Sequence, residues 1–254
     1  MSIKQRLNRL REKLDDKLQP TTTDLLFRWI VNFRSQALVS TEKSAMVFSP
    51  HQDDETLGCG GMIALKRAQG VPVKVVFLTN GQYGRPKWIK PEEIVEVRKQ
   101  EAIAALTTLG VTPSEVGFLE QKDGSLQHLP NEQRQRLIEQ LAQLLQDFKP
   151  EEIYLPHRRD RHPDHEATYE LVQAAVAKAK TQANVFQYGI WIFWQSPLSF
   201  NLKSKELANA YRLSIDSAQA KKQQAIETYQ SQIPGLTRGF LTRFYLPHEI
   251  FFKV

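Results

Sequence analysis

Imidazole and carboxylate side chains gather directly after an apolar segment near the start of the chain. Residues 45–49 are largely apolar and run into Ser-Pro-His-Gln-Asp-Asp-Glu at residues 49–55. His51, Asp53, Asp54 and Glu55 therefore place one imidazole and three carboxylates within five residues. Ligands of open α/β sheets bind at the carboxyl ends of strands, so this position favours a functional site over a solvated loop.

A second cluster follows another short apolar segment, residues 153–155. The sequence then reads Pro-His-Arg-Arg-Asp-Arg-His-Pro-Asp-His over residues 156–165, so four of the six histidines follow two expected strand ends. Parallel strands can bring such ends side by side. His51, Asp54 and His165 would then offer two imidazoles and one carboxylate, leaving coordination positions open as in catalytic zinc sites.

The remaining polar residues suit metal-assisted amide hydrolysis. Zinc lowers the pKa of its bound water to about 7, and Asp53 stands next to a ligand without needing to be one. His162 is placed to stabilise an oxyanion or protonate a leaving group. Asp164 is placed to orient an imidazole through its ring N–H. We therefore expect Asp53, His162 and Asp164 to take part in catalysis.

Two other classes of function fit parts of this pattern. Two histidines and one carboxylate also suit Fe(II) in a non-haem oxygenase, but the extra Asp53 and His162 favour hydrolysis. The net charge of +6 and pI near 9.3 fit a basic module for nucleic acid or anionic lipid. That interpretation leaves both acidic motifs unexplained.

Alternating apolar segments and helical patterns predict the fold class. Strands are expected at 45–49, 73–79, 116–119, 153–155, 185–194 and 245–252, and helices at 56–69, 91–109, 131–148, 164–180 and 203–230. Continuous apolar strands that alternate with helices indicate a mainly parallel sheet with helices on both faces.

The first 43 residues differ from the rest and predict a helical extension. Apolar residues at 3, 7, 10, 14 and 18 step along one helix face, and Pro20 is expected to end that helix. Leu26, Trp29, Ile30 and Phe33 form the expected apolar stripe of a second helix. We therefore divide the chain into an extension, residues 1–43, and a catalytic domain, residues 44–254.

Most of the basic excess lies in the extension. It holds nine Lys and Arg against five Asp and Glu, which leaves a net charge of only +2 for residues 44–254. The favoured role of its stripe is packing on its own domain or on a second copy in a homo-oligomer. Peripheral membrane contact through residues 1–18 is the alternative, and Glu12, Asp15 and Asp16 disfavour nucleic acid. With no signal peptide or membrane span, the chain is expected to be cytoplasmic.

The two motifs together resemble those of a known family. SPHQDDETLGCGG and HPDH are similar to the motifs of LmbE-like, or PIG-L, N-acetylglucosaminyl deacetylases, and the resemblance runs from about Ala45 to at least Thr168. The resemblance implies a Rossmann-like three-layer fold and a divalent metal, usually Zn²⁺, with Fe²⁺ as an alternative. It assigns the metal to His51, Asp54 and His165. It makes Asp53 the general base, His162 the acid or oxyanion stabiliser and Asp164 its partner carboxylate.

The resemblance also indicates the substrate. An amino-sugar conjugate is implied, and Arg98, which precedes Glu101 in an expected helix, matches a residue that binds a substrate hydroxyl or phosphate. Tyr83, Gly84 and Arg85 follow the second strand and are expected to rim the pocket. One residue departs from the family pattern: Gln52 stands where proline is usual, which questions the rigidity of the loop.

Overall fold

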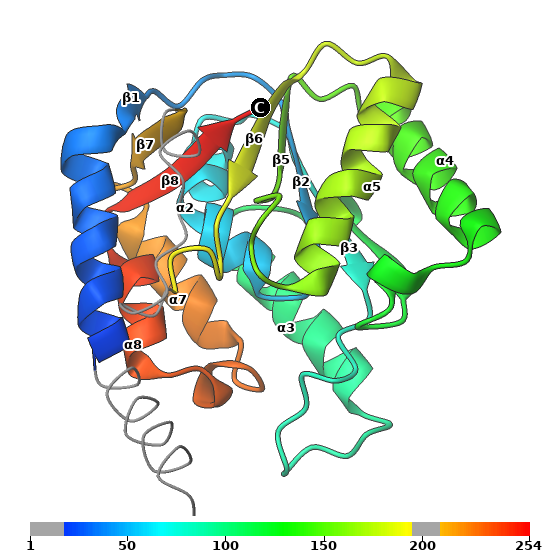
Figure 1. The fold of residues 1–254 in the computed structure, drawn as a ribbon, viewed down its shortest axis with the longest axis horizontal. Helices are drawn as coiled ribbons and strands as arrows, with labels where there is room; N and C mark the ends of the chain where they lie inside the picture. Colours follow the sequence, from blue (N-terminus) through cyan, green and yellow to red (C-terminus); the bar gives the residue numbers. More distant parts are fainter. Residues whose placement is uncertain (1–17, 195–208) are drawn as a thin grey trace, which may run out of the picture.

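The computed structural model describes residues 18–194 and 209–254, and within them an eight-stranded sheet is covered by helices (Figure 1). The sheet order is β1-β7-β8-β6-β5-β2-β3-β4. The strands are β1 (Gln36–Leu38), β2 (Ala45–Ser49), β3 (Val73–Thr79), β4 (Val116–Gln121), β5 (Glu152–Pro156), β6 (Asn184–Tyr188), β7 (Ala210–Ser214) and β8 (His248–Lys253). All neighbours pair in parallel except β8, which is antiparallel to β6 and β7. The expected α/β class with a mainly parallel sheet is confirmed.

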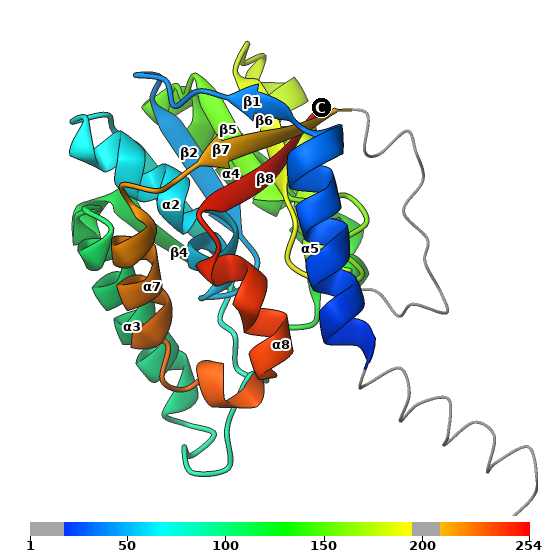
Figure 2. The ribbon, with the colours of Figure 1, turned by 90° about the vertical axis from the view of Figure 1, so that its left-hand side faces the viewer.

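Helices cover both faces of the sheet, as apolar residues on both faces of its central strands require. On one face, α2 (Asp54–Ala68), α3 (Ile94–Thr108) and α7 (Gln219–Thr228) pack over Val47, Val75 and Tyr154. On the other, α4 (Asn131–Phe148) and α5 (Pro163–Ala179) pack over Phe48 and Leu155. Short helices occur at Pro113–Glu115, Leu126–His128, Ile233–Gly235, Arg238–Leu241 (α8) and Thr242–Tyr245. Figure 2 shows the resulting layers from the side.

The N-terminal helix differs from the expectation in its buried face. Residues 18–29 are helical through Pro20, where an end was expected, and a π-helix follows at Ile30–Arg34. The helix buries Leu26, Phe27, Ile30 and Val31 against β7 and β8. Trp29 and Phe33, which we expected on the buried stripe, are 41% and 76% exposed. The helical stripe at residues 3–14 lies outside the described residues.

Two strands were not predicted from the sequence. β1 lies within the expected helical extension and pairs with β7, so this segment also forms an edge of the sheet. β7 lies within residues 203–230, where a single helix was expected, and α7 covers only the later part of that range. The division at residue 43 itself stays a prediction. Among the described residues, no helix is both long enough and apolar enough to span a bilayer.

Candidate metal centre and active site

The central parallel strands end at one edge of the sheet, and the loops that follow them form the site. β5, β2, β3 and β4 are consecutive neighbours in the sheet. β2 continues into the loop that holds His51, and β5 continues into the loop before α5, which carries His165. Because these strands pair in register, Ala45 with Glu152 and Ala45 with Val73, their carboxyl ends place both motifs side by side.

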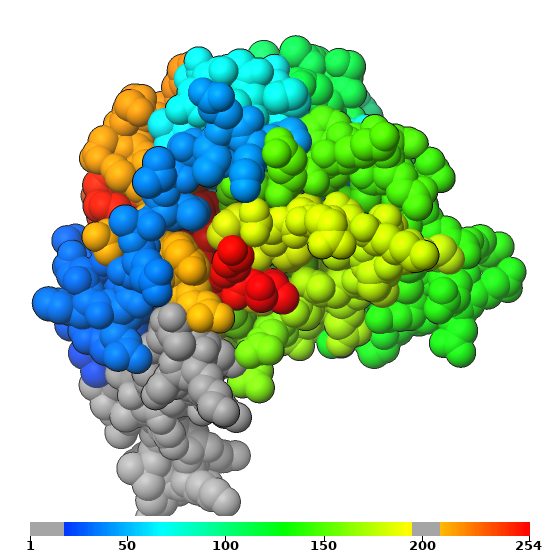
Figure 3. Space-filling model, turned by 90° about the horizontal axis from the view of Figure 1, so that it is seen from above, coloured from blue at the N-terminus to red at the C-terminus, as the bar shows by residue number. Residues whose placement is uncertain are grey.

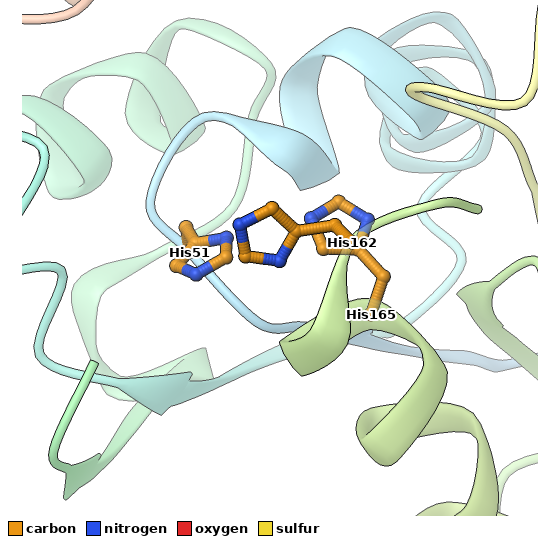
Figure 4. Close-up of side chains that lie close together, drawn as sticks. All are labelled: His51, His162 and His165. Carbon is orange, nitrogen blue, oxygen red and sulfur yellow. The ribbon is translucent and has the colours of Figure 1, made fainter. Parts of the chain in front are cut away.

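Three donor atoms converge at the centre of this edge. Asp54 Oδ2 lies 3.1 Å from His51 Nδ1 and 3.2 Å from His165 Nε2. His162 joins them: its ring centroid is 4.9 Å from that of His51 and 4.8 Å from that of His165. Figure 4 shows the three imidazoles gathered between the β2 loop and the start of α5. All three imidazoles singled out in the sequence are therefore brought together with Asp54.

A buried carboxylate fixes the tautomer of His165. Asp160 Oδ2 lies 2.7 Å from His165 Nδ1, and both side chains are fully buried. Asp160 Oδ1 also accepts the backbone N–H groups of residues 190–192, which hold the carboxylate so that Oδ2 faces the ring N–H of His165. The lone pair of Nε2 then faces Asp54, and this buried nitrogen has no hydrogen-bond partner among the described residues. No sequence pattern had pointed to Asp160.

Two further carboxylates orient His51 in the same way. Its Nε2 lies 3.2 Å from Asp164 Oδ2 and 3.2 Å from Asp123 Oδ1. A proton on Nε2 leaves the lone pair of Nδ1 facing Asp54. Asp164 also accepts the N–H groups of Gly124 and Leu126, so it ties the β4 loop to α5.

Asp123 was not singled out in the sequence, because Asp-Gly is a common turn dipeptide. The turn exists, with Gly124 at φ +72°, but the Asp123 carboxylate also reaches His51. Burial raises its pKa, yet the contact with His51 outweighs burial and lowers the pKa to about 2. The pattern of a polar residue at a strand end, used for the other motifs, also applies to Asp123.

The aspartates around the centre favour positive charge on the groups between them. Burial lowers the pKa of both ligand-candidate histidines, but the surrounding aspartates outweigh it and raise the pKa of His165 to about 9 and that of His51 well above its ordinary value. A bound cation would compensate the negative charge of the aspartates in place of the protons that make the two imidazoles positive. Two imidazole lone pairs and one carboxylate oxygen, each oriented by a neighbour, fit a divalent metal.

Asp53 lies beside this centre in an unusual backbone conformation. Its φ is 145° and its ψ is −31°, and its N–H donates to Glu55 Oε2 at 3.1 Å. Its Oδ1 lies 3.4 Å from Arg98 Nη2. Burial and the charge of Asp54 raise the pKa of Asp53 to about 7, although Arg98 opposes this shift. A carboxylate with that pKa is suited to take and release a proton near neutral pH.

Arg98 joins the loops that follow β2 and β3 at the site. Its guanidinium is 3% exposed and donates to the carbonyls of Gln52 at 2.8 Å and Gly81 at 3.3 Å. Gly81 has φ +63°, and a Cβ there would lie 2.7 Å from Arg98 Nε, so both conformation and space require glycine. Gln52, found in place of proline, is buried and donates from Nε2 to the Thr79 carbonyl at 2.8 Å. That bond fastens the loop to the end of β3.

His162 caps the first turn of α5. Its Nδ1 accepts the backbone N–H of Asp164 at 3.3 Å, so in the neutral ring the proton sits on Nε2. Burial, together with the neighbouring histidines, lowers its pKa to about 4. A neutral ring with an Nε2–H is a hydrogen-bond donor at neutral pH. His157, which was not expected at the centre, packs instead against Phe252 with ring centroids 4.9 Å apart.

An open pocket of about 310 Å³ gives access to the centre, a size typical of small-molecule sites. Tyr83 and Gly84, expected at the rim, are part of its wall. It is lined by His51, Asp53, Asp54, Tyr83, Gly84, Arg98, Asp123, His162, Trp191, Gln232 and Leu236.

Known proteins resemble this chain in sequence and in fold. A probable N-acetyl-α-D-glucosaminyl L-malate deacetylase 2 from Bacillus subtilis (strain 168) is 31% identical over 148 residues, covering 56% of this chain and 64% of the relative. A 1D-myo-inositol 2-acetamido-2-deoxy-α-D-glucopyranoside deacetylase from Mycobacterium sp. (strain KMS) is 31% identical over 160 residues, covering 55% of this chain and 52% of the relative. The matches thus span between about half and two thirds of these relatives.

Solved structures share the fold. A conserved protein from Thermus thermophilus matches with a TM-score of 0.60 and 27% identity, over 79% of this chain and 84% of its own. The N,N'-diacetylchitobiose deacetylase of Pyrococcus horikoshii matches with a TM-score of 0.61 and 22% identity, over 84% of both chains. A 4-carboxy-2-hydroxymuconate hydratase from Pseudomonas putida also matches, with a TM-score of 0.60 and 24% identity, over 80% of this chain and 82% of its own. The fold alone therefore does not fix the reaction.

The family model of PIG-L, described as GlcNAc-PI de-N-acetylase, matches residues 46–176. That range is just over half of the chain and contains both histidine motifs. This chain belongs to the PIG-L family, as its two motifs indicated.

Proposed function

We propose that this protein is a metal-dependent hydrolase that removes the N-acetyl group from an N-acetylglucosamine-type conjugate. The observation that carries the proposal is the convergence of His51 Nδ1, Asp54 Oδ2 and His165 Nε2, with Asp53 beside them. Deacetylase relatives with amino-sugar substrates support it.

His51, Asp54 and His165 would hold the metal. Zn²⁺ fits two imidazoles and one carboxylate, and Fe²⁺ accepts the same donors. When bound, the ion supplies Lewis-acid chemistry: it acidifies water and polarises a carbonyl oxygen. Asp160 and the pair Asp123 and Asp164 orient the two imidazoles.

Asp53 and His162 move and stabilise charge during the reaction. Asp53 takes a proton from the attacking water as the water oxygen bonds to the acetyl carbonyl carbon. The same carboxyl then returns that proton to the sugar nitrogen as the C–N bond breaks, which yields acetate and a free amine. His162 donates its Nε2–H to the carbonyl oxygen, where negative charge develops. Arg98 holds Asp53 in place and borders the pocket with Asp123, where both can bind sugar hydroxyls.

The test is acetate release combined with metal analysis. Asp53→Asn keeps a residue that tolerates positive φ but cannot accept the proton, so we expect kcat to fall about 10²- to 10⁴-fold with metal content unchanged. Asp147→Asn, on the exposed end of α4, is the matched control. Full activity of Asp53→Asn would refute the base assignment. If wild-type protein consumes oxygen during turnover and releases no acetate, the oxygenase alternative replaces this proposal.

A further inference from the structure

The backbone of Asp53 is held in a conformation that residues with a side chain disfavour. Its φ of 145° and ψ of −31° lie outside the regions that such residues normally populate. A strained backbone of this kind persists only where the surrounding contacts enforce it, and it concentrates at functional sites. The contacts that enforce it here therefore determine where the carboxylate of the proposed general base points.

The peptide unit between Gln52 and Asp53 is held from both of its polar ends. The Gln52 carbonyl accepts Arg98 Nη2 at 2.8 Å, and the Asp53 N–H donates to Glu55 Oε2 at 3.1 Å. On the other side of the Asp53 Cα, the Asp53 carbonyl accepts the N–H of Leu57 at 2.9 Å in the first turn of α2. Both peptide planes that meet at this Cα are thus fixed, and the positive φ follows from the angle between them.

Glu55 is itself fixed by two hydroxyl groups. Its side chain is fully buried, and its Oε1 accepts the Thr56 hydroxyl at 2.5 Å and the Tyr229 hydroxyl. Thr56 is the next residue of α2, so its hydroxyl moves with that helix. Tyr229 is 174 residues away in the sequence, at the C-terminal end of α7. Tyr229 therefore connects this carboxylate to a distant part of the chain.

The turn at residues 229–232 fixes Tyr229 and also reaches the pocket. Tyr229 is 1% exposed, and α7, which it follows, packs against α2 and α3 (Figure 2). Its carbonyl accepts the N–H of Gln232 at 3.0 Å. Gln232 lines the pocket and donates from Nε2 to the carbonyl of Gly84, another pocket residue, at 2.7 Å. One turn thus fixes a wall of the pocket and, through Glu55, the backbone of the general base.

We infer that Tyr229 is a positioning residue for the reaction: its hydroxyl fixes Glu55, and Glu55 fixes the strained backbone of Asp53. This inference rests on the proposed function, in which Asp53 takes the proton of the attacking water. Tyr229 lies outside residues 46–176, which the family model matches, so the C-terminal part of the chain completes the base. Without the hydroxyl, Asp53 relaxes toward an ordinary conformation and its carboxylate leaves its place beside the metal ligands.

The chain offers a matched control in Tyr154. Its hydroxyl donates to Glu152 Oε2 at 2.9 Å, and both residues are buried. Glu152 begins β5, so this bond lies toward the end of the sheet opposite the site, and Figure 3 views the molecule from that end. Tyr154→Phe therefore deletes the same kind of hydroxyl-to-carboxylate bond away from Asp53.

The kinetic test measures acetate release from methyl N-acetyl-α-glucosaminide by the zinc-loaded protein. Tyr229→Phe keeps the ring and removes the hydroxyl, so we expect kcat to fall about tenfold, with KM and zinc content within about twofold of wild type. Tyr154→Phe should lower stability but leave kcat unchanged. Glu55→Ala removes the acceptor of the Asp53 N–H and should lower kcat about 100-fold. Glu55→Gln keeps an acceptor oxygen and should recover most of that loss.

A double-mutant cycle tests whether Tyr229 acts through Asp53. In Asp53→Asn the base is already lost, so adding Tyr229→Phe should not lower the residual kcat further. Losses that multiply in the double variant would overturn the inference, as would an equal loss of kcat in Tyr154→Phe. Glu55→Gln as slow as Glu55→Ala would also overturn it, because the charge of Glu55, rather than its bond to the Asp53 N–H, would then matter.

Hydrogen exchange of the Asp53 amide gives a readout that needs no turnover. Because this N–H donates to a buried carboxylate, Tyr229→Phe and Glu55→Ala should speed its exchange by about tenfold, and Tyr154→Phe should not. These exchange rates without acetate release from wild-type protein refute the proposed function and retain the positioning of Asp53. Acetate release with wild-type kcat and wild-type exchange in Tyr229→Phe refutes the positioning role and leaves the deacetylase function intact.

Discussion

The buried Asp160 offers the sharpest test of how the metal centre is oriented. Its Oδ1 accepts the N–H groups of Ile190, Trp191 and Ile192 at 3.0, 3.0 and 2.9 Å, and its Oδ2 faces His165 Nδ1 at 2.7 Å. Three backbone donors on one oxygen fix the carboxylate, so the other oxygen is left to accept the ring proton of His165. The substitution to examine is Asp160→Asn.

The expected defect follows from which atom carries the proton. The asparagine Oδ1 keeps the three backbone N–H groups, so its NH2 must face His165 Nδ1 and donate to it. The ring proton then moves to Nε2, which points at Asp54 and can no longer bind a metal. A flipped amide would leave the N–H groups of Trp191 and Ile192 unpaired, at about 1–3 kcal/mol each, whereas the Ile190 N–H is also within 3.2 Å of the other oxygen. Replacing such an orienting partner costs about 10- to 100-fold in metal affinity, or about 1.4–2.8 kcal/mol.

The assay is a zinc titration against a competing chromophoric chelator. A separate denaturant titration measures the free energy of unfolding and shows whether each variant is folded. Asp160→Asn should bind zinc about 10- to 100-fold more weakly than wild-type protein and than the exposed control Asp147→Asn. Excess zinc should restore part of the acetate release. Wild-type zinc affinity in a folded Asp160→Asn protein would refute the assignment of the His165 tautomer.

Two further predictions concern stability. Gly58→Ala places a Cβ 2.4 Å from Cδ2 of the buried Tyr188 ring, so we expect the free energy of unfolding in denaturant to fall by about 1–3 kcal/mol. Gly235→Ala is the control and should be nearly neutral, because nothing lies within 4 Å of its Cβ. Equal effects of the two substitutions would contradict this packing. Burial lowers the pKa of His157 to about 4, so between pH 6.5 and 4 the unfolded chain binds a proton that the folded chain does not. The contribution of His157 to the free energy of unfolding is therefore complete above pH 6.5 and is lost as the pH falls, by about 2 kcal/mol between pH 7 and pH 5. This part of the loss should be absent in His157→Gln.

The site could be predicted from the sequence where local pattern and sheet geometry agree. The segments before His51 and Asp160 are short and apolar, and both polar motifs begin where those segments end. Parallel pairing of β2 with β5 then brings the motifs together without further information. Asp160 could not be identified as an orienting residue, because its partners at residues 190–192 come from a loop distant in sequence.

The two incorrect predictions, the buried face of the N-terminal helix and the missing strand β7, also have specific causes. In the N-terminal helix, the apolar residues around Leu26 fit two overlapping stripes, and only packing against β7 and β8 selects the one with Phe27 and Val31. β7 has five residues in a segment rich in helix-forming residues, too short for an alternating pattern to emerge. Its strand conformation depends on β1 and β8, which lie at opposite ends of the sequence.

The place of β8 in the sheet sets the order in which a newly made chain can fold. β8 lies between β6 and β7, so residues 248–253 join two parts of the sheet that do not otherwise pair. β1, the first strand of the described residues, pairs with β7, so it can pair in the sheet only after residues 210–214 have been synthesised. The Tyr229 hydroxyl likewise reaches Glu55 only after α7 has been made, and Glu55 holds the backbone of Asp53. A nascent chain therefore exposes the edges of an unfinished sheet until residues 210–253 have been synthesised, and the catalytic loop reaches its final contacts only after α7.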